Sequence, residues 1–102
     1  MNEAVLTKFV GFARVGRRGD KYALYLREDL SQELMKYART KARVYIGGEP
    51  NPLIINGTLA IAREFKRPRI VIFLPKALNP TWQRLYDKEL VVVVEIQADA
   101  GG

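Results

Sequence analysis

The stretch from Tyr22 to Ile46, YALYLREDLSQELMKYARTKARVYI, decides the fold because the chain contains its pattern twice. Shifted by 48 positions, a second copy follows without gaps from Ile70 to Val94, IVIFLPKALNPTWQRLYDKELVVVV. Apolar residues coincide at 13 of the 25 positions. Three positions are identical: Leu26/Leu74, Leu30/Leu78 and Val44/Val92. Each copy predicts a short strand, a helix of two or three turns and a second strand. Any two strand-helix-strand units resemble each other to some extent, so the internal duplication is a hypothesis.

The residues before the first copy extend it into a β-rich unit. Val5 to Val15 is rich in β-branched and aromatic residues, which predicts one long strand or two short ones. With the next strand it makes a predicted hairpin, Phe9 to Leu26. Its glycine-bracketed turn, Gly16 to Lys21, carries three cations. Asp29, with Gln32 three residues on, has the spacing of a capping box and predicts a helix start there or at Ser31.

The second half repeats the order strand, basic connection, strand, helix, strand. Asn56-Gly57 signals a hairpin turn, and Thr58 to Ala62 is predicted as the strand after it. Pro68 cannot donate to a ladder, so the next strand is predicted to begin after it. Asn79-Pro80 supplies a cap and a first-turn proline for the second helix. The run Val91 to Val94 is apolar on both faces, which predicts a place inside a closed barrel or a sandwiched interface.

The pattern predicts a single domain, residues 1–102, built from two repeats at about 9–56 and 57–96. The second repeat lacks a counterpart of the strand predicted at Leu53 to Ile55, so its last strand would leave an open edge. We expect Glu3 to Lys8 to pair there and to close the two halves around a pseudo-twofold axis. Ala98 to Gly102 is expected to be frayed.

Composition narrows the classes of function. The chain has no cysteine and no histidine, which removes thiol chemistry, the commonest general base and the commonest metal ligand. It also lacks a Walker-type phosphate loop, so we expect neither an enzyme nor a metal or other cofactor. No apolar run approaches the ~20 residues of a membrane span, so no membrane partner is expected. With no secretory-signal pattern and no cysteine, we expect a cytoplasmic protein.

Charge points toward nucleic acid. There are 17 Lys and Arg against 11 Asp and Glu, giving a net charge of +6 and a pI near 9.8. Such an excess in a small domain favours a polyanionic partner. Five cations and one acid lie between Lys8 and Lys21, and four cations and one acid between Arg63 and Arg69. Both clusters occupy the same place in the repeat, so a twofold-related fold would present them on one face. Solvated tips of a basic protein remain the alternative.

This layout resembles the AbrB/SpoVT family of swapped-hairpin DNA-binding domains, whose fold MazE-type antitoxins share. The resemblance covers Gly11 to Ile55 and again Gly57 to Ile96. Its most telling pieces are Val15-Gly16-Arg17 and Phe73-Leu74-Pro75-Lys76; the first copy has Arg27-Glu28 where the second has proline and lysine. The resemblance implies a mainly β fold with two short helices (α+β). It further implies a swapped-hairpin, AbrB-like barrel formed as a single-chain pseudo-dimer.

The resemblance also implies a function. Family members bind duplex DNA in transcriptional regulation through basic residues of the first strand and the turn after it. The matching positions here are Arg14, Arg17, Arg18, Arg63, Lys66 and Arg67; Lys21 and Arg69 complete the two clusters. The expected protein is a DNA-binding regulator or a chromatin-associated protein, as a monomeric pseudo-dimer or a homodimer. An antitoxin role is disfavoured because only about six residues follow Ile96.

Two other interpretations stay open. Five aromatic residues lie near the basic turns: Phe12, Tyr22, Tyr25, Phe65 and Phe73. They could stack the bases of RNA or single-stranded DNA, although their alternation also fits core positions. A protein-interaction module without nucleic acid is the third possibility. Binding to duplex, single-stranded and RNA ligands distinguishes the three.

Overall fold

Seven strands and four short helical segments follow one another in the computed structural model, which describes residues 4–48, 50–64 and 66–99. The strands are β1 (Ala4–Arg18), β2 (Lys21–Leu26), β3 (Lys41–Ile46), β4 (Leu53–Thr58), β5 (Ala60–Glu64), β6 (Arg67–Phe73) and β7 (Glu89–Asp99). The helical segments are α1 (Glu28–Leu34), η1 (Met35–Tyr37), η2 (Lys76–Leu78) and α2 (Asn79–Leu85). The protein is therefore mainly β with two short α-helices, as predicted.

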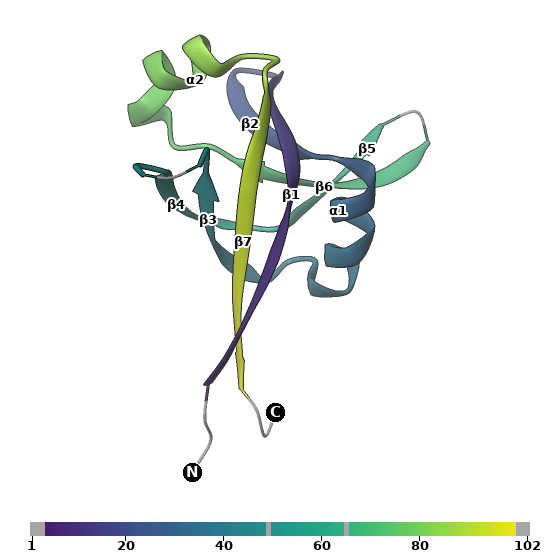
Figure 1. Cartoon of the computed structure of the whole chain (residues 1–102). Helices are drawn as coiled ribbons and strands as arrows, with labels where there is room; N and C mark the ends of the chain where they lie inside the picture. The colour runs from purple at the N-terminus through teal and green to yellow at the C-terminus, as the bar shows by residue number, and fades with distance from the viewer. Residues whose placement is uncertain (1–3, 49, 65, 100–102) are drawn as a thin grey trace.

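The strands form one antiparallel sheet in the order β4-β3-β7-β1-β2-β6-β5. In Figure 1, β1 and β7 run together through the middle of the molecule, while β3-β4 and β5-β6 swing to opposite sides. The two end strands of the sheet, β4 and β5, are joined by Leu59, which is fully buried. Its N–H donates to Thr40 O (2.9 Å), and its carbonyl accepts from Arg39 N–H (2.7 Å). The sheet thus curls into a half-barrel.

The hydrophobic core fills the inside of the curl. Alternate strand residues point inward, and these are buried: Ala13, Val15, Leu24, Leu26, Val44, Ile46, Ile70, Ile72, Val92 and Val94. The helices add Leu30, Leu34 and Trp82, whose indole N–H donates to Pro75 O at 2.9 Å. Burying one large side chain contributes ~1.5–3 kcal/mol, so this shared core is the main force holding the curled sheet together.

The helix starts differ from the predicted caps. α1 follows Arg27, and Asp29 accepts the N–H of Leu30 (2.9 Å), so the capping box is not formed. Ser31 is buried and its hydroxyl accepts the N–H of Ile70 (2.8 Å), which fixes α1 to β6. α2 includes Asn79 because η2 leads straight into it, so that residue is already helical and does not act as the cap.

The prediction of a turn at Asn56-Gly57 is wrong. Both residues lie within β4, opposite Arg43 and Ala42 of β3. A Cβ added at Gly57 would lie 2.7 Å from Cγ2 of Ile72. The glycine therefore serves a close approach between strands rather than a left-handed backbone, which is the other common reason for glycine in a strand.

The two basic hairpins are longer and tighter than predicted. β1 continues through Arg18, so only Gly19-Asp20 forms the first turn. β6 begins at Arg67 and includes Pro68, which lies opposite Arg63. Proline is tolerated there because β2 pairs with β6 only further along, at residues 71–73, and the ladder loses no donor.

The N-terminal strand pairs with the last strand as predicted. Pairing runs from Ala4 opposite Asp99 to Lys8 opposite Glu95 and continues to Arg14. Glu3 and residues 100–102 lie outside the described residues. The predicted fraying is wrong for residues 98 and 99, because β1 offers them a partner strand. Figure 1 shows the two ends of the described chain leaving side by side.

The valine run of β7 is buried on one face only. Val92 and Val94 are fully buried, whereas Val91 is 42% exposed. Val93 is half-buried. The prediction of burial on both faces is therefore wrong for Val91, and it holds only in part for Val93.

Candidate nucleic-acid interface

The first basic hairpin, β1–β2, carries cations on both of its faces. Residues opposite each other across a ladder share a face. Arg18 lies opposite Lys21, whereas Arg17 lies opposite Tyr22 on the other face. All three cations are exposed, so the hairpin presents positive charge to two sides.

Aromatic rings contact two of these cations. The guanidinium carbon of Arg17 lies 5.3 Å from the ring centre of Tyr22, and Nζ of Lys21 lies 5.6 Å from that of Phe73. Such contacts orient a cation without neutralising it. Within the described part of the chain, neither these two residues nor Arg18 forms an ion pair.

Asp20, the acid in this turn, is bound to another element. Its carboxylate lies 3.4 Å from Nζ of Lys76, at the start of η2. The hydrogen bond from Lys76, and then its charge, lower the pKa of Asp20 below its ordinary value of 3.8. The contact ties the hairpin turn to the segment that precedes α2.

The second basic hairpin, β5–β6, also carries two exposed cations for which the described residues offer no ion-pair partner. Arg63 and Lys66 are exposed, and Lys66 occupies the turn with φ 68°. Neither forms an ion pair with a side chain in the described ranges. Phe65, the aromatic residue predicted near this turn, lies outside them.

The other two cations of this cluster bind α1 and β2. Nη1 of Arg67 donates to Oε1 of Glu28 at 3.1 Å, which joins the hairpin to the start of α1. Nε of Arg69 donates to the carbonyl of Leu26 at 2.8 Å, and its side chain is half-buried. Both arginines line a groove of about 500 Å³ along α1. They contribute charge to the surface, but their orientation is set by protein contacts.

Arginines from both clusters meet around Tyr25. Arg14, Arg17 and Arg69 line a hollow of about 280 Å³ together with this tyrosine. A Cβ added at Gly16 would lie 2.8 Å from Cε1 of Tyr25, so the glycine lets the ring lie against β1. The hydroxyl of Tyr25 donates to Arg17 O at 3.5 Å. The hollow is a positively charged site with an aromatic wall.

Tyr86 and Asp87 complete the rim of this hollow. Nη1 of Arg14 donates to the carbonyl of Asp87 at 2.8 Å and lies 3.7 Å from its carboxylate. Tyr86 is 49% exposed. Sequence reasoning missed both residues, because they follow α2 and reach the hollow through contacts with distant residues, such as the hydrogen bond from Asp87 N–H to Val15 O (2.9 Å). Gly16, which the sequence placed at the start of the turn and which the structure places within β1, was the one available signal.

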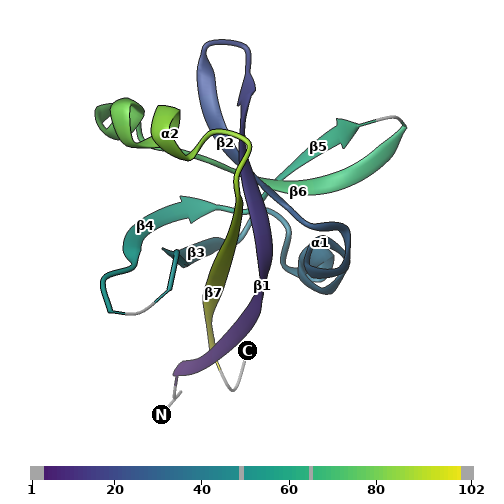
Figure 2. The same cartoon turned by 45° about the horizontal axis from the view of Figure 1, so that its top comes forward.

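The eight predicted residues thus occupy a hollow and two hairpin tips rather than one continuous patch. Both tips project from the half of the molecule away from the chain ends, but they diverge as separate fingers (Figure 2). Arg18 and Lys21 belong to one finger, and Arg63 and Lys66 to the other. Among the aromatic residues proposed for stacking, Tyr22 is buried, whereas Phe12 and Phe73 are exposed.

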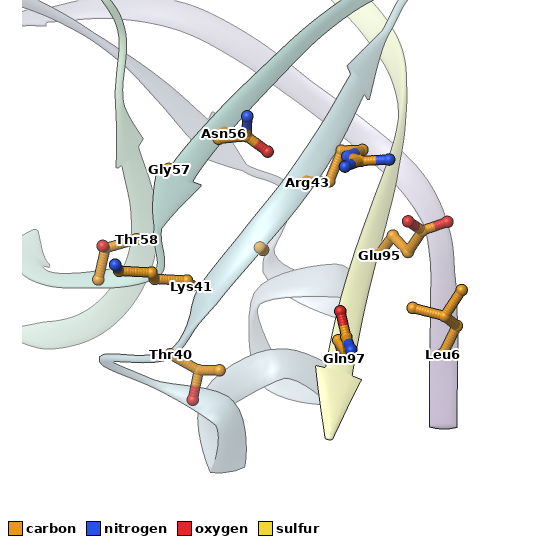
Figure 3. Close-up of a pocket in the computed structure, with 10 residues that line it drawn as sticks. Leu6, Thr40, Lys41, Arg43, Asn56, Gly57, Thr58, Glu95 and Gln97 are labelled. Atoms are coloured by element: carbon orange, nitrogen blue, oxygen red, sulfur yellow. The ribbon is translucent and has the colours of Figure 1, made fainter. Parts of the chain in front are cut away.

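A wider hollow of about 790 Å³ lies on another part of the sheet, between β3, β4, β7 and β1 (Figure 3). Most of the residues that line it are polar, among them Lys41, Arg43, Asn56, Thr58, Glu95 and Gln97. None of the eight predicted residues lines it. Its size alone gives it no place in the candidate interface, because it offers neither clustered arginines nor an aromatic wall.

Within the described residues, no three His, Cys, Asp or Glu side chains gather as metal ligands. Likewise, no helix among them is both long and apolar enough to cross a membrane. Comparison of the chain with protein-family models, with curated proteins and with solved structures finds no match.

Proposed function

We propose that the chain is a pseudo-twofold barrel of the swapped-hairpin type, made of two repeats. Strand register supports this. When a strand pairs antiparallel with its own copy across a twofold axis, the residue nearest the axis lies opposite its equivalent. Leu24 of β2 lies opposite Ile72 of β6, and Tyr45 of β3 lies opposite Val93 of β7. Both pairs are separated by the 48 positions that relate the two sequence copies.

The remaining strands fit the same relation. β1 pairs with β7 along its first part and with β2 along its second. Correspondingly, β4 pairs with β3 and β5 pairs with β6. Because only Leu59 separates β4 from β5, these two strands together are the counterpart of β1. This arrangement is the one that the resemblance to AbrB-type domains implies.

The proposed function of this barrel is binding of duplex DNA, as a transcriptional regulator or a chromatin-associated protein. One observation carries the proposal: two exposed hairpins project from the same half of the molecule (Figure 2) and hold cations that no described carboxylate neutralises. These cations are Arg17, Arg18, Lys21, Arg63 and Lys66. The major groove of B-DNA admits a two-stranded β-ribbon, and arginine recognises phosphate and guanine through paired hydrogen bonds.

Duplex DNA fits these hairpins better than duplex RNA. The major groove of A-form RNA is deep and too narrow for side chains to read. Single strands remain a rival because Tyr25 and Tyr86 border an arginine-lined hollow and tyrosine can stack a base. The ribbon shape favours the duplex, since both fingers are two-stranded hairpins, whereas the hollow is a single site at the side of the first hairpin.

The test is a fluorescence-anisotropy titration of duplex DNA, single-stranded DNA and RNA at about 50 and 200 mM salt. We expect the duplex to bind most tightly. If all five cations contact phosphates, the log–log salt slope approaches −4.5, since each neutralised phosphate contributes about −0.9. Arg17→Ala/Arg18→Ala should weaken binding by about tenfold or more and reduce the slope by about 2.

The matched control is Lys36→Ala/Lys41→Ala, which removes the same charge from exposed positions outside both hairpins. Its affinity should stay within about threefold of the unmodified chain. Equal losses in the two variants would mean that only net charge matters. Tighter binding of single strands would favour the stacking alternative, and no binding to any nucleic acid would leave the protein-interaction module.

A further inference from the structure

The outer face of β4, β3, β7 and β1 carries an apolar row that is exposed at its two ends and half-buried at Tyr45 and Val93 in its middle. Ile54, Tyr45, Val93 and Val10 lie opposite one another across the four strands. Val10 is 67% exposed and Ile54 is 57% exposed. Single exposed apolar residues are ordinary, but a contiguous row across four strands marks an interaction surface. We call these four residues the apolar row.

Neither α-helix packs over the apolar row. Figures 1 and 2 place α1 and α2 on either side of β7 rather than over it. Val91 and Phe12, the next opposite pair on this face, are exposed as well. The four-valine run predicted a sandwiched interface, and its outward valines, Val91 and Val93, belong to this surface.

The neighbouring row on the same face is charged and polar. It consists of Asn56, Arg43, Glu95 and Lys8, again opposite one another. Nζ of Lys8 lies 3.7 Å from Oε2 of Glu95. Arg43 is exposed and, among described residues, forms no ion pair, although it stands beside Glu95 (Figure 3). In this row, Arg43 is therefore the cation still available to a carboxylate from outside.

We propose that this face binds a second copy of the chain. The twofold axis would run between β3 and β7, parallel to both strands. Rotation about it reverses the strand order, so Tyr45 meets the partner's Val93. By the same rotation Ile54 meets the partner's Val10. An apolar row thus packs against an apolar row, as in two aligned sheets about 10 Å apart.

The same rotation makes the charged row complementary to itself. Arg43 meets the partner's Glu95, and Glu95 meets the partner's Arg43. Lys8 meets the partner's Asn56, so no cation faces another cation. An isologous interface requires this self-complementarity, because both chains use the same patch and every contact between two residues therefore occurs twice. Charge complementarity is the reason for choosing a second copy as the occupant.

The interface leaves the basic hairpin tips free. The apolar and charged rows use β3, β4, β7 and the first part of β1, whereas the tips belong to the end of β1 and to β2, β5 and β6. Dimer formation and DNA binding are therefore separable, and each can fail without the other.

The first experiment measures mass by sedimentation velocity over a wide range of protein concentration. The unmodified chain should shift from monomer to dimer as its concentration rises. Val10→Lys/Ile54→Lys should raise the dissociation constant of the dimer at least about tenfold. Ile61→Lys/Leu78→Lys, which places the same charges on exposed apolar residues elsewhere, should leave it unchanged. Equal melting temperatures for the two variants would show that both are folded.

The second experiment uses charge exchange between chains. Arg43→Glu and Glu95→Arg should each be monomeric, because like charges would meet at both symmetry-related positions. An equimolar mixture of the two variants should form a heterodimer, since each contact then joins opposite charges. An unmodified chain that stays monomeric throughout, or variants of the apolar row that dimerise like the unmodified chain, would overturn the proposal. So would a mixture that remains monomeric.

Discussion

At the scale of single residues, Gly57 is where packing leaves no room for a side chain. A Cβ there would lie 2.7 Å from Cγ2 of Ile72, which is fully buried. Gly57→Ala should therefore lower the free energy of unfolding by about 1–3 kcal/mol, the usual cost of overpacking. Gly48→Ala, where a Cβ meets no atom within 4 Å, should change it by less than about 0.5 kcal/mol. Urea unfolding followed by circular dichroism measures both, and equal effects would contradict the close approach.

Asp20 allows a second test at this scale. Lys76 lowers the pKa of its carboxyl group below the ordinary 3.8 by a hydrogen bond and by charge. A group with a lowered pKa in the folded state contributes stability above its unfolded pKa. That contribution is lost as the pH falls through the folded value. The contact between the first turn and η2 is thus present at neutral pH and weakens as the pH falls through the lowered pKa of Asp20.

A titration of side-chain carboxyl carbons by NMR checks this assignment. In the unmodified chain, Asp20 should titrate below 3.8. In Lys76→Ala its midpoint should return toward that ordinary value, while Lys36→Ala should leave it unchanged. An identical midpoint in all three proteins would show that Lys76 does not contact the turn in solution.

At the scale of elements, the first hairpin carries a like-charged pair at its tip. Arg18 lies opposite Lys21 next to the turn, and like charges opposite each other destabilise a ladder. Arg18→Glu should therefore raise the free energy of unfolding by roughly 0.2–1 kcal/mol while weakening duplex binding. Lys41→Glu, an equal charge change opposite Thr58, should do neither. Thermal melting measures the stability of both variants, and fluorescence anisotropy measures their affinity for duplex DNA. An Arg18→Glu variant that is less stable and binds duplex DNA as tightly as the unmodified chain would contradict the role proposed for the tip.

Periodicity predicted most elements, because their side chains alternate between core and solvent. The strands and helices of both copies lie where the 48-residue repeat places them. Predictions failed where one residue type has two structural uses. Gly57 serves a close approach and not a turn, and Pro68 lies in a ladder position that needs no donor. Such choices depend on which strand lies alongside, and local sequence does not contain that information.

The candidate site was predictable only in part for the same reason. The exposed tip cations follow from charge clustering and hairpin signals, and Arg17, Arg18 and Lys21 lie where predicted. The hollow around Tyr25 depends instead on residues far apart in sequence. Arg69 and Asp87 reach it through β6 and the end of α2. The clustering of charges along the sequence predicts which charged residues share one hairpin. It does not predict the charged residues that tertiary contacts bring to the same site.

At the scale of the whole molecule, an ion pair joins each basic hairpin to a helical segment far from it in the sequence. Asp20 of the first hairpin binds Lys76 before α2, and Arg67 of the second hairpin binds Glu28 at the start of α1. Lys76 and Glu28 are 48 positions apart and so are equivalents in the proposed barrel. Their charges are reversed, as are those of the hairpin residues they bind. Each hairpin residue therefore has a charge opposite to that of the helical residue it contacts. It has the same charge as the equivalent helical residue of its own repeat.

The proposed twofold relation predicts that the chain can be reopened at the position equivalent to its ends. Ala4 lies opposite Asp99, so the ends can be joined, and the loop between β3 and β4 at residues 47–52 is the counterpart of that junction. A circular permutant opened in this loop should fold with its free energy of unfolding changed by less than about 1 kcal/mol, a shift of several degrees in melting temperature. It should also keep its affinity for duplex DNA.

A permutant opened at Leu59 is the control for this experiment. The two openings differ in the backbone that they cut: Leu59 is fully buried and hydrogen-bonds to Arg39 and Thr40, whereas Asn51 in the loop is exposed. Cutting at Leu59 divides the counterpart of β1, so cooperative thermal unfolding should be lost or strongly weakened. If both permutants unfold alike, β4 and β5 do not act as one strand. If only the loop permutant fails, the two halves are not equivalent, and the twofold relation is wrong.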